Sequence, residues 1–368
     1  MKHLCLFICL LCVTGLPVHA QISFVNHNTL FPTWNLHSAM CVGVADLNGD
    51  RKDDVFRIVG GDTIFVEYQG VPNGPFTELW LQGQIAYPWS VCAGDVDNDG
   101  RNEMICGDDS YGVLLYSWNG NSYSRTDVSG LVNASNMMMP QGVNCADING
   151  DSYLDIFMCN DVGRSHLFQG AGAVTSWSFN PAMIDLTTAP ASDTSGNYAS
   201  IWTDINADGY IDLLITKCRQ GVTNPADGRR IDQVFINNGN GTYTQDVTNW
   251  TNLRDGAQGW STASGDIDND GDMDMFVLNY DVNARLMINN GAGVFTDAMA
   301  GSGIVNTTTF FGQNASFHDF DNDGFADLLI AGSEHFLYHN NGNGTFTQTA
   351  NLFPIPSMHL CLDMRLAI

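Results

Sequence analysis

Short apolar runs recur along the chain, and each one directly follows a short acidic loop. The runs are rich in branched and aromatic residues, are bounded by Gly and Asn, and are too short for helices, so they predict buried β-strands. They lie at residues 55–56, 104–106, 156–158, 213–215, 275–278 and 328–330.

Three further strands are expected in each unit, one before the acidic loop and two after the apolar run that follows the loop. The first is clear at residues 40–45, 90–93 and 199–202, and a third strand is clear at 112–116, 233–236 and 285–288. Asn-Gly turns at 237–243, 289–295 and 340–346 then lead into a fourth strand. Both turn residues tolerate positive φ, so Asn-Gly between apolar runs predicts a hairpin.

The acidic loops carry a carboxylate or Asn at positions 1, 3, 5 and 9. Their first residues are separated by 49, 52, 57, 62 and 53 positions, a spacing typical of a repeat architecture. Four antiparallel strands in each such unit predict a propeller blade. The predicted ligand residues are Asp46, Asn48, Asp50 and Asp54; Asp95, Asp97, Asp99 and Glu103; Asp147, Asn149, Asp151 and Asp155; Asp204, Asn206, Asp208 and Asp212; Asp266, Asp268, Asp270 and Asp274; and Asp319, Asp321, Asp323 and Asp327.

This spacing directs alternate oxygens toward one centre, which suits calcium. Calcium accepts six to eight oxygens at about 2.3–2.6 Å, whereas magnesium retains its waters and zinc prefers Cys or His. Asp, Asn and Gly are also ordinary turn formers. However, about three carboxylates in each loop would repel one another without a cation. We therefore expect up to six calcium ions.

An EF-hand begins with the same spacing but needs a bidentate Glu at position 12 between two helices. Position 12 of these loops lies in or beside an apolar run and is never a carboxylate. The residues there are Arg57, Cys106, Met158, Ile215, Val277 and Ile330. The sequence therefore excludes EF-hands.

The composition is globular but strongly acidic. Among 368 residues, 40 acids stand against 14 bases, and 21 of the acids occupy the predicted ligand positions. Six calcium ions would change the formal net charge from −26 to −14. Such acidity argues against nucleic acid or anionic lipid as a partner.

Residues 1–20 have the pattern of a secretory signal peptide, with a basic start, a short apolar core and small residues at −3 and −1. Cleavage is expected before Gln21, and no later segment reaches about 18 consecutive apolar residues, so no transmembrane segment is expected. The mature protein is then secreted or at the cell surface. Its cysteines include the equally spaced pairs Cys92/Cys106 and Cys145/Cys159, for which buried thiols are favoured over cross-strand disulfides.

The acidic loop together with the Asn-Asn-Gly-x-Gly-x-Phe hairpin resembles the FG-GAP/VCBS repeat family, the propeller of integrin α-subunit heads and of many secreted bacterial proteins. The resemblance covers residues 21–350 and implies an all-β propeller of four-stranded antiparallel blades. Residues 22–25 resemble an isolated closing strand, and residues 351–368 resemble the start of a further blade. We therefore expect six complete blades in a seven-bladed ring whose last blade is cut short, with a six-bladed ring as the alternative.

The resemblance also implies that the calcium loops share one face of the ring and that partners bind on the other. Long connections at residues 181–197, 217–230 and 249–259 are then on the partner face, and basic and aromatic side chains there suit acidic or sugar ligands. The candidate ligand-binding residues are Arg219, Arg229, Arg230, Trp250 and Arg254.

No catalytic constellation is visible in the sequence. The leading functional hypothesis is an exported calcium-binding propeller that acts as a binding or adhesion module for a protein or glycan. The alternatives are a secreted polysaccharide-cleaving enzyme of the lyase type, which needs a basic cluster at the ring centre, and a structural fragment of a larger surface protein.

Overall fold

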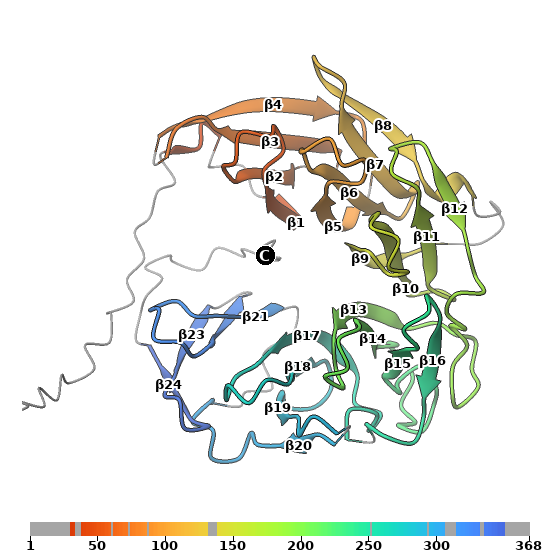
Figure 1. The fold of residues 1–368 in the computed structure, drawn as a ribbon, viewed down its shortest axis with the longest axis vertical. Coiled ribbons are helices and arrows are strands. Elements are labelled where there is room, and N and C mark those ends of the chain that lie inside the picture. The colour runs from red at the N-terminus through yellow and green to blue at the C-terminus, as the bar shows by residue number, and fades with distance from the viewer. Residues whose placement is uncertain are drawn as a thin grey trace, which may run out of the picture.

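Six four-stranded antiparallel sheets follow one another around a common axis (Figure 1). The computed structural model describes residues 30–33, 38–59, 62–72, 74–86, 88–131, 138–250, 252–292, 294–305, 314–331 and 335–349. Within each sheet the strand order follows the chain, as expected for propeller blades. The all-β fold with six complete blades is confirmed.

We number the sheets as blades 1 to 6. Blade 1 contains β1 (Ser38–Ala45), β2 (Asp54–Val59), β3 (Thr63–Gln69) and β4 (Phe76–Gln82); blade 2 contains β5 (Pro88–Gly94), β6 (Glu103–Asp108), β7 (Gly112–Trp118) and β8 (Tyr123–Asp127); blade 3 contains β9 (Pro140–Ala146), β10 (Asp155–Asn160), β11 (His166–Gly170) and β12 (Trp177–Phe179). Blade 4 contains β13 (Asn197–Thr203), β14 (Asp212–Lys217), β15 (Gln233–Asn237) and β16 (Tyr243–Asp246); blade 5 contains β17 (Gly259–Gly265), β18 (Asp274–Asn279), β19 (Arg285–Ile288) and β20 (Thr296–Asp297); blade 6 contains β21 (Asn314–His318), β22 (Asp327–Ala331), β23 (Phe336–Asn340) and β24 (Phe346–Gln348). A short 3-10 helix, η2 (Ser129–Leu131), follows β8.

The first strand of each blade lies nearest the axis, and these inner strands contact one another in chain order from β1 to β21. In Figure 1, blades 1 and 6 are separated by a wider interval than the other neighbouring pairs. The predicted signal peptide, the closing strand at 22–25 and the further blade at 351–368 lie outside the described residues, so the seven-bladed expectation stays a prediction.

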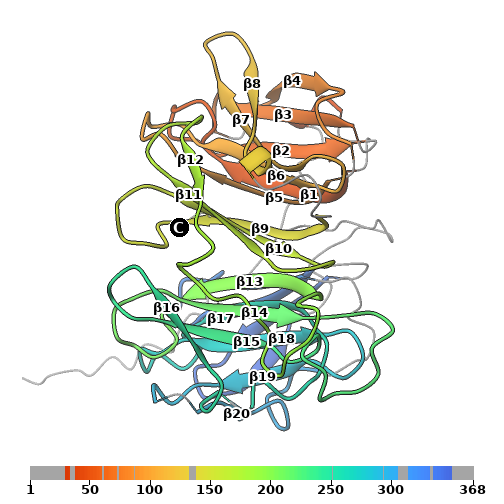
Figure 2. The same ribbon diagram turned by 90° about the vertical axis from the view of Figure 1, so that its right-hand side faces the viewer.

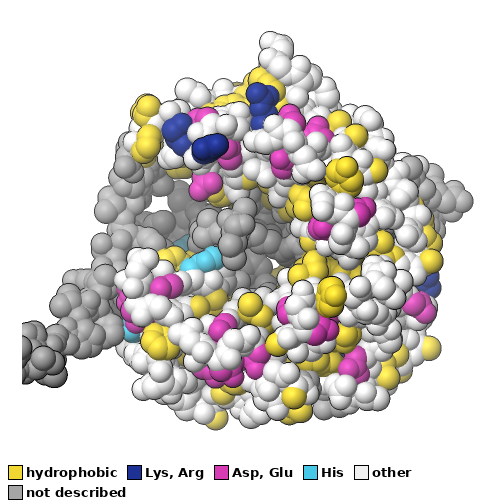
Figure 3. Space-filling model, in the orientation of Figure 1, with side chains coloured by type: hydrophobic (Ala, Val, Ile, Leu, Met, Phe, Trp, Pro, Cys, Tyr) yellow, Lys and Arg dark blue, Asp and Glu magenta, His cyan; other side chains and the backbone are white. Residues whose placement is uncertain are grey.

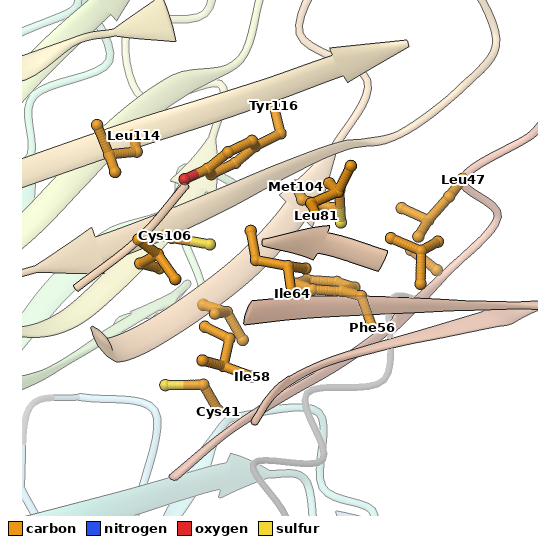
Figure 4. Packing of buried hydrophobic residues seen from close by; sticks show 14 residues of the cluster. Cys41, Leu47, Phe56, Ile58, Ile64, Leu81, Met104, Cys106, Leu114 and Tyr116 are labelled. Atoms are coloured by element: carbon orange, nitrogen blue, oxygen red, sulfur yellow. The ribbon is translucent and has the colours of Figure 1, made fainter. Parts of the chain in front are cut away.

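The hydrophobic core lies between neighbouring blades. The second strand of a blade packs against blades on both sides, so its alternate residues enter two different cores. In β6, Met104 and Cys106 join the core shared with blade 1 (Figure 4), whereas Ile105 joins the core shared with blade 3. This two-sided burial explains why the sequence there is continuously apolar rather than alternating.

The acidic loops connect the first and second strands of each blade, and every position-12 residue lies in a second strand, which confirms that the loops are not EF-hands. Because the strands alternate in direction, the turns between third and fourth strands lie on the same face as these loops. We call this the loop-bearing face. The connections from second to third strands and from blade to blade form the opposite face, and Figure 2 shows both faces from the side. Within the described residues, no helix has the length and apolar character needed to cross a membrane.

The cysteine pairs are not placed for cross-strand disulfides. Cys106 is a buried free thiol opposite Val91, while Cys92 lies opposite Ile105 and therefore points to the other side of the sheet. Cys145 and Cys159 are three register steps apart on β9 and β10. The thiols thus occupy positions typical of small hydrophobic side chains.

Candidate functional site

The carboxylate at position 1 organises each acidic loop. In all six loops one of its oxygens accepts the backbone N–H of position 5 and the other accepts that of position 6. In the fourth loop, Asp204 Oδ1 lies 3.0 Å from the Asp208 nitrogen and Oδ2 lies 2.7 Å from the Gly209 nitrogen. These bonds curl the loop around the position-1 side chain.

The loops also share two residues with positive φ, at positions 4 and 6. Gly occupies position 6 in loops 2, 4, 5 and 6, with φ between 87° and 96°. In loops 1 and 3 the Gly is at position 4 instead, and Arg51 (φ 65°) and Ser152 (φ 73°) hold the left-handed conformation at position 6. The loop conformation is therefore kept although the glycine has moved.

The carboxylate at position 9 begins the second strand and is buried in every loop. One of its oxygens accepts the N–H of position 2 in all six loops. In five loops the other oxygen accepts an N–H at the end of the third strand. For Asp274 these nitrogens belong to Ile267, at 3.0 Å, and Asn289, at 2.8 Å. Position 9 thus joins the loop to the body of the blade.

Burial makes the position-9 groups unusually basic. It raises the pKa of Asp54, Asp155 and Asp212 to about 6, that of Asp274 to about 7 and that of Glu103 to about 8. Repulsion from other carboxylates of the same loop adds to this effect. A cation among these groups would favour their ionised forms.

Carboxylate oxygens converge in loops 2, 5 and 6. Three ligand atoms lie within 4.8 Å of one another in each of the groups Asp95/Asp97/Asp99, Asp266/Asp268/Asp274 and Asp319/Asp321/Asp323. The donors in these groups are all oxygens, which suits a hard divalent cation.

Loops 1, 3 and 4 have Asn at position 3 and are arranged differently. In loops 3 and 4 the amide groups of Asn149 and Asn206 donate to the position-5 carboxylates, at 2.9 and 3.0 Å. In loop 1, Lys52 Nζ lies 2.7 Å from Asp50 Oδ2. The amide oxygens remain potential ligands after rotation of the side chain, whereas Lys52 already supplies a positive charge to loop 1.

The carboxylates of the sixth loop also contact a residue that was not predicted from the sequence as part of the site. His339, in β23, has its Nδ1 atom 3.2 Å from Asp327 Oδ1 and 3.4 Å from Asp321 Oδ2. The corresponding residue of blade 5 is Ile288, which precedes Asn289 as His339 precedes Asn340. When the hairpins are aligned, a histidine replaces the apolar Ile288 at this position, and this difference is the sequence signal that could have indicated its role.

Loops 4 and 5 are also tied to the next blade. Asn289 Nδ2 of blade 5 donates to the Ile205 carbonyl in the fourth loop at 2.8 Å, and Asn340 Nδ2 of blade 6 donates to the Ile267 carbonyl at 2.7 Å. In blades 5 and 6 the first Asn of the hairpin turn therefore also joins neighbouring blades.

Comparison with protein-family models confirms the repeat assignment. The model described as an FG-GAP-like repeat matches residues 46–106, 95–158, 147–215, 204–277, 266–330 and 319–364. The chain belongs to the FG-GAP-like repeat family. Each match begins at the first residue of an acidic loop, so the loop and the strands after it carry the family pattern.

Solved structures share the fold of these FG-GAP-like repeats. An Agrocybe aegerita lectin that recognises non-reducing terminal N-acetylglucosamine is 19% identical with a TM-score of 0.56, covering 84% of this chain and 79% of that one. A BBS1 fragment in complex with ARL6 is 11% identical (TM-score 0.50; 86% and 84% covered), and an AofleA mutant from Arthrobotrys oligospora is 10% identical (TM-score 0.50; 86% and 87% covered). None of the curated proteins compared with the chain matches it.

The five candidate ligand residues are largely engaged within the FG-GAP-like fold. Trp250 is only 3% exposed and packs against Phe295, with ring centroids 5.6 Å apart. Arg230 is 6% exposed, donates to the carbonyls of Gly256 and Val222 and pairs with Asp281. The structure corrects the prediction for these two residues, because neither is available to a ligand.

The other three arginines also have partners on the opposite face. Arg254 donates to the carbonyls of Asp232 and Ala189, at 3.1 and 2.7 Å. Arg219 pairs with Asp161 at 3.2 Å and Arg229 with Asp227 at 2.8 Å, and the side chains of Arg219 and Arg229 remain about one-third exposed. Arg219 and Arg229 are therefore the predicted contacts that retain access to solvent.

Proposed function

We propose that the chain is an exported, calcium-stabilised propeller that acts as a binding module for a glycan or a protein. The observation that carries the calcium proposal is the convergence of three carboxylates within 4.8 Å in each of loops 2, 5 and 6. Export is supported by the signal-like pattern of residues 1–20. Export also fits the calcium proposal, because extracellular calcium is concentrated enough to fill weak oxygen sites.

The charge distribution supports the same proposal. Acidic side chains are spread over successive blades on the face shown in Figure 3. In loops 2, 5 and 6 the candidate ligand positions hold four carboxylates each, one of them buried with a raised pKa. Calcium bound there would offset their mutual repulsion while leaving the loop's backbone hydrogen bonds in place.

The role as a binding module is supported by the family and by the fold. Propellers similar in fold recognise terminal N-acetylglucosamine in the fungal lectin and bind ARL6 in the BBS1 complex. For this chain we infer an extracellular ligand, either glycan or protein, and a structural rather than reactive role for calcium.

Calcium removal tests the first part of the proposal. The mature protein is dialysed against chelator, and its melting is followed by calorimetry before and after calcium or magnesium is restored. Each filled site should stabilise the fold by about 2.7 kcal/mol at a hundredfold excess over Kd, so the loss should be the largest effect of any single treatment. A melting temperature that is the same with chelator and with calcium would refute the structural sites.

A glycan array probed with the mature protein, with and without chelator, tests the second part. Binding to a defined set of glycans that weakens when calcium is removed is the expected result. If no glycan binds, capture of an extracellular protein partner by the calcium-loaded but not the chelated protein is required for the proposal to stand.

A further inference from the structure

Loop 6 brings an imidazole ring together with its carboxylates. His339, in β23 (Figure 1), has Nδ1 3.2 Å from Asp327 Oδ1 and 3.4 Å from Asp321 Oδ2, and its Nε2 lies 3.9 Å from Asp323 Oδ2. One ligand atom from each of Asp321, Asp327 and His339 lies within 4.8 Å of the other two. The loop, β22 and β23 therefore direct two carboxylates and one nitrogen toward a common centre.

The separations match those of ligand atoms around one metal ion. Zinc binds His nitrogen and carboxylate oxygen at about 2.0–2.2 Å, so neighbouring ligand atoms are about 3.0 Å apart in octahedral and about 3.4 Å apart in tetrahedral geometry. The distances of 3.2 and 3.4 Å from His339 Nδ1 fall in this range. A single N–H on Nδ1 points well at only one of the two oxygens, whereas a metal ion in its place contacts all three atoms.

Both carboxylates of this group are buried. Asp327 is 0% exposed and Asp321 is 7% exposed, although the residue at position 3 is at least partly exposed in the other five loops. Taking a charged carboxylate out of water is costly unless a positive charge compensates it. The burial of Asp321, which its sequence position alone does not explain, therefore indicates a positive charge held inside loop 6.

The histidine is a departure from the neighbouring blades on an unchanged backbone. The residue before the hairpin Asn is Ile236 in blade 4 and Ile288 in blade 5. In blades 4, 5 and 6 alike, the N–H of that Asn donates to the position-9 carboxylate at 2.8 Å. The same frame thus carries an apolar side chain beside loops 4 and 5 but a metal-ligating side chain beside loop 6.

The donor atoms decide which ion suits this arrangement. Calcium and magnesium are bound by oxygen, whereas imidazole nitrogen suits zinc and other transition-metal ions. Zinc is also held in many proteins by three side chains, with water at an open position. One imidazole and two buried carboxylates form such a three-ligand set.

We propose that loop 6 is a transition-metal site that prefers Zn²⁺ to Ca²⁺, with His339, Asp321 and Asp327 as the ligands. The proposal rests on the proposed cation-binding role of the acidic loops and changes the ion at one of them. Asp321 also belongs to the all-carboxylate group Asp319/Asp321/Asp323, so the two ions compete for this loop.

Two variants test the site by introducing residues that other blades carry at the same positions. His339→Ile introduces the Ile of blades 4 and 5, and Asp321→Asn introduces the Asn of loops 1, 3 and 4, so both variants should keep the fold. His335→Gln is the matched control, because His335 lies just before the other end of β23. Melting in chelator checks that all three variants are folded.

The mature protein in excess calcium is titrated with Zn²⁺ by calorimetry and with Co²⁺ by visible spectroscopy, because Co²⁺ reports its ligands through d–d absorption. Wild type and His335→Gln should each bind one Zn²⁺ and give the same Co²⁺ band. Even outer-shell partners are worth about 10–100-fold in metal affinity, so loss of the His339 ligand should weaken Zn²⁺ binding about a hundredfold and abolish the band. Asp321→Asn, which keeps an oxygen but loses its charge, should weaken Zn²⁺ binding by about tenfold.

Equal Zn²⁺ affinity of wild type and His339→Ile would overturn the proposal. A wild type that binds no Zn²⁺ in excess calcium would also overturn it, and His339 would then be an internal cation of the loop. If His339→Ile is unfolded in chelator, Asp321→Asn decides alone, and an unchanged Zn²⁺ affinity of that variant refutes the site.

Calcium-dependent melting of the same proteins separates this site from the proposed structural calcium. If calcium stabilises wild type and His339→Ile alike, and Zn²⁺ affinity does not depend on His339, the zinc site fails and the calcium proposal stands. If Zn²⁺ binds through His339 but calcium stabilises neither protein, the calcium proposal fails and the zinc site stands.

Discussion

On the loop-bearing face, the carboxylates of loop 5 gather without an ion pair to Lys or Arg among the described residues, whereas on the opposite face guanidinium groups already neutralise the acids they meet. Asp266 and its neighbours in the fifth loop lie within 4.8 Å of one another, but Arg230 pairs with Asp281 across blades 4 and 5. The first face depends on short-range bonds that recur with every repeat, and the second on contacts that occur once. A cation should therefore stabilise the loop-bearing face and leave the opposite face unaffected.

Among single substitutions, the largest effect is expected from the buried position-9 carboxylate, which belongs to the framework of the blade as well as to the proposed ion site. Asp274→Asn keeps one acceptor oxygen but turns an NH₂ group toward a backbone N–H. At pH 4 in chelator, where the Asp274 carboxyl is largely uncharged and its burial costs the wild type little, the variant should be less stable by about 2–3 kcal/mol. Asp268→Asn is the matched control, because position 3 is exposed and is Asn in three other loops. Urea unfolding in chelator measures both variants.

Restoring calcium then sharpens the distinction. Asp268→Asn should lose part of the stabilisation by calcium although it is nearly as stable as wild type in chelator. If Asp274→Asn and Asp268→Asn were equally stable in chelator, position 9 would be a ligand only, and the framework role inferred from its hydrogen bonds would be wrong.

On the opposite face, Arg230→Ala should cost about 2 kcal/mol, because it leaves Asp281 without its ion pair and two backbone carbonyls without a donor. Arg229→Ala is the control: its side chain is 30% exposed, and exposed ion pairs contribute at most about 1 kcal/mol. Both losses should be the same with calcium and with chelator. A calcium-dependent loss for Arg230→Ala would show that the two faces are coupled.

Lys217 gives the opposite face a dependence on pH. Burial lowers its pKa to about 8, although Nζ lies 2.7 Å from both Ser195 O and Asn197 Oδ1, and it faces Asp161, Asp193, Asp232 and Cys159. Below pH 8 the lysine is charged in both states and destabilises the fold. Between pH 8 and the ordinary lysine pKa near 10.5, the unfolded chain binds more protons than the folded chain. The free energy of unfolding therefore rises by about 1 kcal/mol for each pH unit.

The measurement compares wild type with Lys217→Met in urea between pH 7.5 and 10. Other groups that titrate in this range are common to both proteins, so the difference between the two curves isolates Lys217. The stability of the wild type relative to that of Lys217→Met should rise with pH above about pH 8. A constant difference would mean that Lys217 titrates alike in the folded and unfolded chains.

The repeated features of the molecule were predictable from the sequence, because each arises within about ten residues. The loop spacing and the Asn-Gly turns sufficed for six blades and for the grouping of carboxylates. The unrepeated contacts were not predictable. Arg230 meets Asp281 across 51 positions, so no local pattern signals that contact. His339 reaches Asp327 from another strand, and only its replacement of the Ile288 of blade 5 in the aligned hairpins marks it. Nothing in a long connection marks which side chains fold inward, so the sequence does not distinguish the buried Arg230 and Trp250 from surface residues.

The smallest expected effect concerns the shape of the loop itself. The moved glycine of loop 3 leaves Ser152, an exposed residue with φ 73°, in a conformation that costs a residue with a Cβ about 1–2 kcal/mol. Ser152→Gly should relieve this strain and, after the greater entropy of glycine in the unfolded chain, stabilise the protein by about 0.5 kcal/mol. Ser152→Ala retains the Cβ and should give no gain. Equal stability of the Gly and Ala variants in urea unfolding would mean that the loop bears no strain at position 6, and that the loop-bearing face tolerates either glycine position at no cost.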